Sequence, residues 1–343
     1  MRTHPLRPAS VPLAPPVPAP ELPERMQAVR MTGTGDPSVL VPAEVPLPQP
    51  VMSELLVRVV AAGINPIDAK TRAGRGLSAH VDGPIVPGFD FSGVVVRTPY
   101  ESHPLAVGTE VYGMAAFPRT GGSYAEYVVV PSQSVARKPA SLSHVEAAGV
   151  PLAALTAWGL VVETAHAHEG QRMLIHAGAG GVGHFAVQLA AYFGAHVTTT
   201  VSGRNRAWAR ELGAARVIDR TAERFEDVVR EVDVVIDLVG NAQGDETGTR
   251  SLQTLRHGGL YVNVPTHSWP DFARAAAAAG VRSTSYRVIP DGDVLTTLSR
   301  LLDSRSVHVF VEDVFPLARA ADAHRTLEAG HTRGKIVLQV SED

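Results

Sequence analysis

A glycine-rich segment at residues 178–183 has the spacing G-x-G-x-x-G. It lies between a short apolar run, 173–177, and apolar residues that recur at helical spacing. In such a strand–turn–helix, the glycines allow a tight turn, a close approach of backbone to a pyrophosphate, and close helix packing. The free N–H groups at the start of the helix favour an anion. We therefore expect a dinucleotide to contact Gly178, Ala179, Gly180, Gly181, Val182 and Gly183.

The residues after the next strand indicate which dinucleotide binds. An NAD-specific site places an Asp or Glu about 20 residues beyond the glycines, where it holds the ribose 2′-OH. Here residues 200–204 contain no acid, and the first one is Glu211. Ser202 and Arg204 instead offer a hydroxyl and a guanidinium that can bind a 2′-phosphate. The alternative is an ordinary solvated loop arginine; the position favours NADPH.

Asn65 and Lys70 are candidate catalytic residues. They follow an apolar run that ends near Ala61, and Pro66 predicts the start of a loop there. Asn65 can present its amide to a carbonyl, and Lys70 can supply a cation or a proton to a reduced substrate. The alternative is an Asx-type turn with a solvated lysine.

Composition excludes several other classes of function. The chain has 343 residues, 31 basic and 34 acidic, so no basic excess predicts a nucleic-acid partner or an anionic membrane. It has no cysteine, which excludes disulfides and Cys-ligated metals, and its 14 histidines form no tight ligand pair, so we expect no metal site. The longest nearly apolar stretch, 147–162, is shorter than the ~20 residues that span a bilayer. Nothing suggests export, and we expect a cytoplasmic protein.

These residues must be positioned by α/β architecture. Residues 1–25 contain eight prolines and predict a disordered tail, or an untranslated stretch if the chain begins at Met26. Residues 26–151 show β-branched runs and predict an irregular β domain. Residues 152–289 alternate apolar runs with helical patterns, which predicts a six-stranded doubly wound parallel sheet. Residues 290–343 predict a helix, a strand, a second helix and a final strand. The six strands of the sheet are expected at 173–177, 196–201, 215–218, 232–239, 260–264 and 281–288.

Taken together, the motifs resemble the medium-chain dehydrogenase/reductase superfamily, in its zinc-independent quinone oxidoreductase branch. The resemblance implies a GroES-like catalytic domain formed by residues 26–151 and 290–343, with a Rossmann NADPH-binding domain at 152–289 inserted in it. It also implies a cleft between the two for a small-molecule substrate, and a homodimer paired around 281–288. The segments that carry the resemblance are 63–68, 86–93, 122–127, 155–157, 179–183 and 333–338.

The resemblance extends the cofactor site and shows departures from the family. It adds Arg220 as a second cation near the ribose phosphate, where relatives have a tyrosine. Lys70 replaces a tyrosine of many quinone reductases, Gly76 replaces the acid tyrosine of enoyl-thioester reductases, and Phe89 replaces a zinc-binding histidine. The remaining cofactor contacts that we expect are Asn65, Thr156, Val239, Val264 and Lys335.

The predicted function is NADPH-dependent hydride transfer to a quinone or a conjugated enone. One alternative is a stereospecific enoyl reductase of a biosynthetic, polyketide-type pathway. The other is a protein that binds NADPH without turnover, because the glycine turn serves both.

Overall fold

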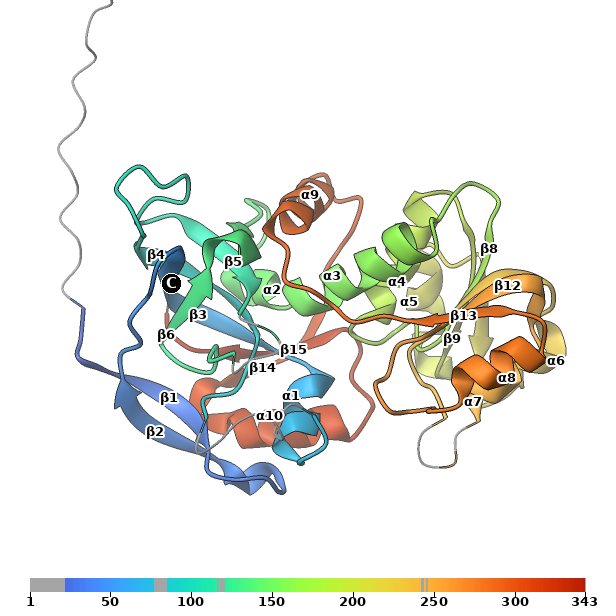
Figure 1. Cartoon of the computed structure of the whole chain (residues 1–343), viewed down its shortest axis with the longest axis horizontal. Coiled ribbons are helices and arrows are strands. Elements are labelled where there is room, and N and C mark those ends of the chain that lie inside the picture. Colours follow the sequence, from blue (N-terminus) through green and yellow to red (C-terminus); the bar gives the residue numbers. More distant parts are fainter. Residues whose placement is uncertain are drawn as a thin grey trace, which may run out of the picture.

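The computed structural model describes residues 22–76, 85–115, 117, 121–241, 244 and 246–342. Most of the predicted proline-rich tail, residues 1–21, therefore lies outside the described residues. The described chain forms two larger sheets, which occupy opposite sides of the molecule (Figure 1).

The first large sheet has six strands, and every pair within it is parallel. Its order, β10-β9-β8-β11-β12-β13, is the 3-2-1-4-5-6 order of a doubly wound dinucleotide-binding sheet. This confirms the predicted fold class. The order reverses between β8 and β11, and ligands of such sheets bind where the order reverses, outside the carboxyl ends of the strands. The strands are β8 (Arg172–Ile175), β9 (His196–Val201), β10 (Arg216–Asp219), β11 (Val232–Asp237), β12 (Leu255–Asn263) and β13 (Arg282–Ser285).

Among the described residues, five α-helices lie between these strands. The helix after the glycine turn is α4, and seven of its ten residues are small or apolar. It therefore packs against one face of the sheet, at β8 and β9. The last strand, β13, is shorter than the predicted 281–288, since the residues after Ser285 leave the sheet. The helices are α4 (Gly183–Tyr192), α5 (Arg206–Glu211), α6 (Phe225–Val228), α7 (Thr247–Leu252) and α8 (Phe272–Ala278).

The second large sheet unites the two ends of the chain. Its order is β14-β15-β3-β4-β5-β7, with β6 paired to β3. The C-terminal strand β15 lies antiparallel to β3, so that Ile336 faces Ile64. A separate two-stranded sheet pairs β1 (Arg25–Met31) with β2 (Leu40–Pro46). The strands of the second sheet are β3 (Glu54–Ile64), β4 (Asp90–Arg97), β5 (Glu110–Met114), β6 (Tyr127–Pro131), β7 (Val135–Arg137), β14 (Val311–Pro316) and β15 (Lys335–Gln339).

The segment after β3 is a helix, α1 (Pro66–Arg72), and the prediction of a loop there is wrong. Asn65 precedes it as the N-cap, Pro66 occupies its first turn, and Asp68 accepts the Asn65 N–H. A proline is tolerated at this position because the first turn has no intrahelical use for its missing N–H. The same proline that suggested a loop therefore begins a helix, and this helix carries Lys70.

Helices between the two sheets join them through one apolar core. The apolar stretch 147–162 includes all of α3 (Pro151–Trp158) and the first part of the π-helical turn that follows, Gly159–Thr164. In the described part of the chain, no helix is long and apolar enough to cross a membrane. The largest core cluster includes Tyr112 of β5 and Met173 of β8, which belong to different sheets. The remaining helices are α2 (His144–Ala148), α9 (Gly292–Asp303) and α10 (Ala320–Glu328).

Candidate active site

The glycine turn has the space that a dinucleotide diphosphate requires. A Cβ added at Gly178 would lie 2.0 Å from the Thr199 hydroxyl, and one at Gly183 would lie 2.1 Å from the Ala177 carbonyl. These two glycines are needed for close packing. A Cβ at Gly180, by contrast, would meet only the Ala177 carbonyl, at 3.3 Å. The backbone at Gly180 is therefore open to a ligand, and the residues present fit the phosphates of the cofactor.

The two residues predicted to bind a 2′-phosphate lie at the carboxyl end of β9. Arg204 is exposed and donates a hydrogen bond to the carbonyl of His331, in the loop before β15. The Ser202 hydroxyl accepts a hydrogen bond from Asn205 at 3.3 Å. The N–H of Arg220 donates to the Val201 carbonyl at 2.9 Å, which places the residue after β10 beside this loop.

An acid, Asp219, lies in the same place, and sequence reasoning missed it because it comes from the third strand. A Cβ on Gly203 would lie 2.4 Å from its carboxylate. The carboxylate accepts hydrogen bonds from the hydroxyl and the N–H of Thr221, at 2.6 and 3.0 Å. These bonds hold the pKa of Asp219 below its usual value. Thr221 therefore stabilises the ionised form of Asp219, and the carboxylate remains negatively charged beside Gly203.

Asn65 is buried and all of its polar atoms are engaged. Its N–H donates to Asp68 and its amide nitrogen donates to Asp90, both at 2.8 Å. Its amide oxygen accepts a hydrogen bond from the Lys335 ammonium at 2.5 Å. Asn65 is 1% exposed. In this arrangement the side chain fixes the start of α1.

Lys335 connects the glycine turn to the start of α1. Its ammonium also donates to the Ile64 carbonyl at 2.9 Å and lies 3.7 Å from the Asp90 carboxylate. The preceding residue, Gly334, donates its N–H to the Ala179 carbonyl at 2.9 Å. Burial lowers the pKa of Lys335 and the neighbouring Asp90 opposes that shift. The ammonium therefore compensates a buried carboxylate.

A second buried hydrogen-bond network, which the sequence analysis does not predict, links α1 to Tyr124 and His324. Tyr124 is 3.4 Å from the Asp68 carboxylate and 3.2 Å from Nε2 of His324, hydroxyl oxygen to ring nitrogen. Burial raises the pKa of Asp68 to about 7, whereas burial lowers that of His324 to about 3. An acid at the third helical position after an N-cap Asn is the one sequence signal that could have identified Asp68.

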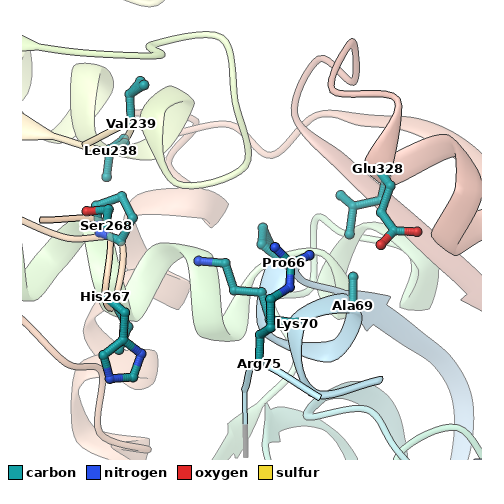
Figure 2. A pocket seen from close by; sticks show the side chains of 12 residues that line it. Pro66, Ala69, Lys70, Arg75, Leu238, Val239, His267, Ser268 and Glu328 are labelled. Carbon is teal, nitrogen blue, oxygen red and sulfur yellow. The ribbon is translucent and has the colours of Figure 1, made fainter. Parts of the chain in front are cut away.

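A cavity of about 680 Å³ lies between α1 and the loops after β11 and β12. The volume is in the range of small-molecule sites, about 300–1,000 Å³. The Lys70 side chain extends into it from α1, toward the wall formed by Leu238 and Ser268 (Figure 2). Its lining residues are Pro66, Ala69, Lys70, Arg75, Leu238, Val239, Pro265, Thr266, His267, Ser268, Leu327 and Glu328.

The other predicted site residues differ in whether they reach the cavity. Val239 lines the cavity, and Val264 packs against the main core at the end of β12. The Thr156 hydroxyl donates to the Leu152 carbonyl at 2.7 Å, inside α3. Lys70 is half-buried; burial lowers its pKa, and Arg75 lowers it further. The site thus brings Lys70 and Val239 to one cavity and keeps Thr156 within its own helix.

Comparison with known proteins identifies the family. Residues 52–140 match the alcohol dehydrogenase GroES-like domain, and residues 212–338 match the zinc-binding dehydrogenase model. The chain is 34% identical to the NADPH-dependent alkenal/one oxidoreductase of Arabidopsis thaliana, covering 92% of this chain and 80% of that protein. The solved quinone oxidoreductase of Coxiella burnetii is 36% identical, with a TM-score of 0.87, over 92% of this chain and all of the other.

The chain belongs to the medium-chain dehydrogenase/reductase superfamily. This confirms the resemblance inferred from the motifs. Another relative, the 2-methylene-furan-3-one reductase of Solanum lycopersicum, is 35% identical over 92% of this chain and 80% of that protein.

Within this superfamily the chain falls in the zinc-independent, quinone oxidoreductase-like branch. Phe89 stands where zinc-dependent members have a histidine, and it is buried edge-on against Phe117, with ring centroids 5.2 Å apart. The chain also lacks cysteine, the ligand of the structural zinc lobe. Across the described residues, no group of three or more potential metal ligands occurs.

Proposed function

We propose that this protein is an NADPH-dependent oxidoreductase that delivers hydride to a conjugated enone or a quinone. The observation that carries the proposal is the cavity at the carboxyl ends of β11 and β12, with an apolar wall at Leu238 and Val239 and a lysine pointing into it. Relatives named alkenal/one oxidoreductase, quinone oxidoreductase and 2-methylene-furan-3-one reductase support it. The open space at Gly180 in the glycine turn supports the binding of a dinucleotide cofactor.

NADPH supplies the hydride when bound; the residues of this chain manage charge and protons. When hydride reaches the conjugated system, negative charge develops on the carbonyl oxygen of the substrate. The Lys70 ammonium stabilises that charge and transfers one proton to the reduced substrate, which balances the added hydride. Because burial and Arg75 lower the pKa of Lys70, its proton is more readily given up than that of an ordinary lysine.

We assign the cofactor contacts in three groups. The backbone of residues 178–183 holds the diphosphate, and Ser202, Arg204 and Arg220 hold the 2′-phosphate. Val239, Val264 and Thr156 would contact the nicotinamide end of the cofactor. Asn65 and Lys335, which are buried and bonded to each other, act as positioning residues that fix α1 against the glycine turn.

The assembly, domain division and location are part of the proposal. Residues 26–151 and 290–343 form the catalytic domain and residues 152–289 the cofactor domain. Strand β13 is at the edge of its sheet, and pairing with a second copy would cover its free backbone groups. Light scattering tests the homodimer. Some relatives are named as mitochondrial or chloroplastic proteins; we propose a cytoplasmic location for this chain, which a fluorescent fusion tests.

The activity is tested by following NADPH oxidation with quinones, enones and enoyl thioesters, with metal chelator present. Turnover of enones or quinones is the expected result. A trans-enoyl reductase of Aspergillus terreus is 30% identical over 84% of this chain and 87% of that protein; a strong preference for enoyl thioesters would favour that second candidate. Tight NADPH binding without turnover of any acceptor would overturn the proposal and leave a non-catalytic binding protein.

A further inference from the structure

The ionisable side chains around the cavity are unbalanced in charge. Lys70 and Arg75 both line it, and their side chains have no hydrogen-bond or ion-pair partner among the described residues. The one acid in the lining, Glu328, accepts a hydrogen bond from the buried guanidinium of Arg72 and is neutralised by it. The cavity is therefore positive on the side of α1.

The two cations are held together by the backbone. The N–H of Arg75 donates to the carbonyl of Lys70 at 2.8 Å, which closes the turn after α1 and fixes one residue against the other. Each charge opposes its neighbour, and the effect is visible in the pKa of Lys70, which burial lowers first and Arg75 lowers further. A bound anion would relieve this repulsion.

The diphosphate of NADPH is not that anion. It belongs at the glycine turn, and none of residues 178–183 lines the cavity. Opposite α1, the loops after β11 and β12 contribute three apolar residues, Leu238, Val239 and Pro265, and three polar ones, Thr266, His267 and Ser268. The space thus has a cationic side at α1 and, opposite it, an apolar patch of Leu238, Val239 and Pro265 within a wall that also carries polar residues.

We propose that the substrate carries an anionic group, a carboxylate or a similar oxyanion, which Arg75 binds while its conjugated part lies between Lys70 and the wall of Leu238 and Val239. Arg75 suits this role because its planar guanidinium is always charged and matches an oxyanion with two parallel hydrogen bonds. Lys70 remains the proton donor. This inference rests on the proposed function and specifies its substrate class.

The test compares 6-oxo-4-heptenoate with its methyl ester, in which two methylene groups separate the enone from the acid or ester, so that the reacting group is the same. With NADPH saturating, we expect kcat/KM for the acid to exceed that for the ester roughly 10- to 100-fold, mostly through KM, as one charge-assisted contact implies. Arg75→Gln should reduce the acid-to-ester ratio by about the same factor, and Arg75→Glu should bring it below one. The ratio cancels a general loss of active protein. Arg97→Gln, an exposed arginine on β4 outside the cavity, should keep the ratio.

A binding measurement separates this inference from the proposed function. The saturated analogue 6-oxoheptanoate and its methyl ester are titrated by calorimetry into protein saturated with NADP⁺. Tighter binding of the acid, lost in Arg75→Gln, supports the inference even if no acceptor is reduced. Equal binding of acid and ester, or a preference that Arg75→Gln leaves intact, overturns it, and turnover of the ester alone would then still support the enone reductase.

Discussion

The ammonium of Lys335 donates a hydrogen bond of 2.5 Å to the side-chain oxygen of Asn65, although 270 residues separate them. The pair ties the C-terminal strand to the start of α1. The preceding residue, Gly334, donates a hydrogen bond to Ala179 in the glycine turn. Residues 334 and 335 together therefore set the distance between the glycine turn and the helix that carries Lys70. The two halves of the site are thus joined through a buried charge.

Replacing Lys335 with methionine should destabilise the protein strongly. The change leaves the Asp90 carboxylate, which is 0% exposed, without its cation. Removing one partner of a buried ion pair costs roughly 3–5 kcal/mol. Urea unfolding followed by circular dichroism measures the loss. The double variant Lys335→Met with Asp90→Asn should recover a large part of it, and a single-variant loss below about 1 kcal/mol would show that the pair behaves like a surface one.

Asp68 should make stability fall as pH rises. Burial raises the pKa of its carboxyl to about 7, against 3.8 in an unfolded chain. Between these values the folded protein holds a proton that the unfolded chain has lost, so the free energy of unfolding decreases with pH and the effect is complete above about pH 7. Asp68→Asn keeps an acceptor for the Asn65 N–H and removes the titration.

Urea unfolding at a series of pH values between 4 and 8 tests this. The free energy of unfolding of Asp68→Asn minus that of the wild type should increase as pH rises toward about 7. The difference removes the opposite contribution of buried histidines such as His324, whose pKa is lowered in both proteins. Asp227→Asn, at an exposed position, is the matched control and should follow the wild type. Parallel curves for Asp68→Asn and the wild type would show that this carboxyl does not titrate in the range.

Local patterns predicted the parts of the fold that depend on neighbours in sequence. The six strands of the parallel sheet and the turn at 178–183 follow from apolar runs and glycine spacing. A proline after a strand is typical of a loop and predicts one after Asn65, but a proline in the first turn also suits a helix, and the structure has the helix. Its N-cap bond from Asn65 to Asp68 could have been recognised.

The missed site residues depend on contacts between distant segments. Asp219 reaches the loop of Ser202 and Arg204 only because β10 lies beside β9 in the sheet, and the sequence alone does not show which strands are adjacent. Asp90 and Lys335 meet only because β15 and β4 both pair with β3. Spacing along the chain carries no information about contacts between residues on distant strands, and nothing in the local sequence around either residue indicates its partner.

Lys70 should act as a proton donor more than as a binding residue. Lys70→Met should lower kcat with an enone, which needs a proton after hydride arrives, more than with a quinone whose product takes protons from water. Since the ammonium is the active form, wild-type kcat for the enone should fall as pH rises through a pKa below that of an ordinary lysine. Lys70→Arg keeps the positive charge, and its kcat for the enone should not show this fall with rising pH. Equal losses of kcat with both acceptors in Lys70→Met would indicate positioning instead.

Arg204 should select NADPH over NADH. It stands at the carboxyl end of β9, and the carbonyl of His331 holds its guanidinium beside the loop of Ser202. A charge-assisted hydrogen bond contributes about 1.5–3 kcal/mol, so Arg204→Ala should lower kcat/KM for NADPH roughly 10- to 100-fold. The value for NADH should change little. Arg220→Ala is the comparison, because it lies after the adjacent strand. If Arg220→Ala loses less kcat/KM for NADPH than Arg204→Ala does, Arg204 is the main ligand of the 2′-phosphate. If Arg204→Ala instead loses as much kcat/KM for NADH as for NADPH, the bond from Arg204 to His331 supports the loop and the 2′-phosphate is bound elsewhere.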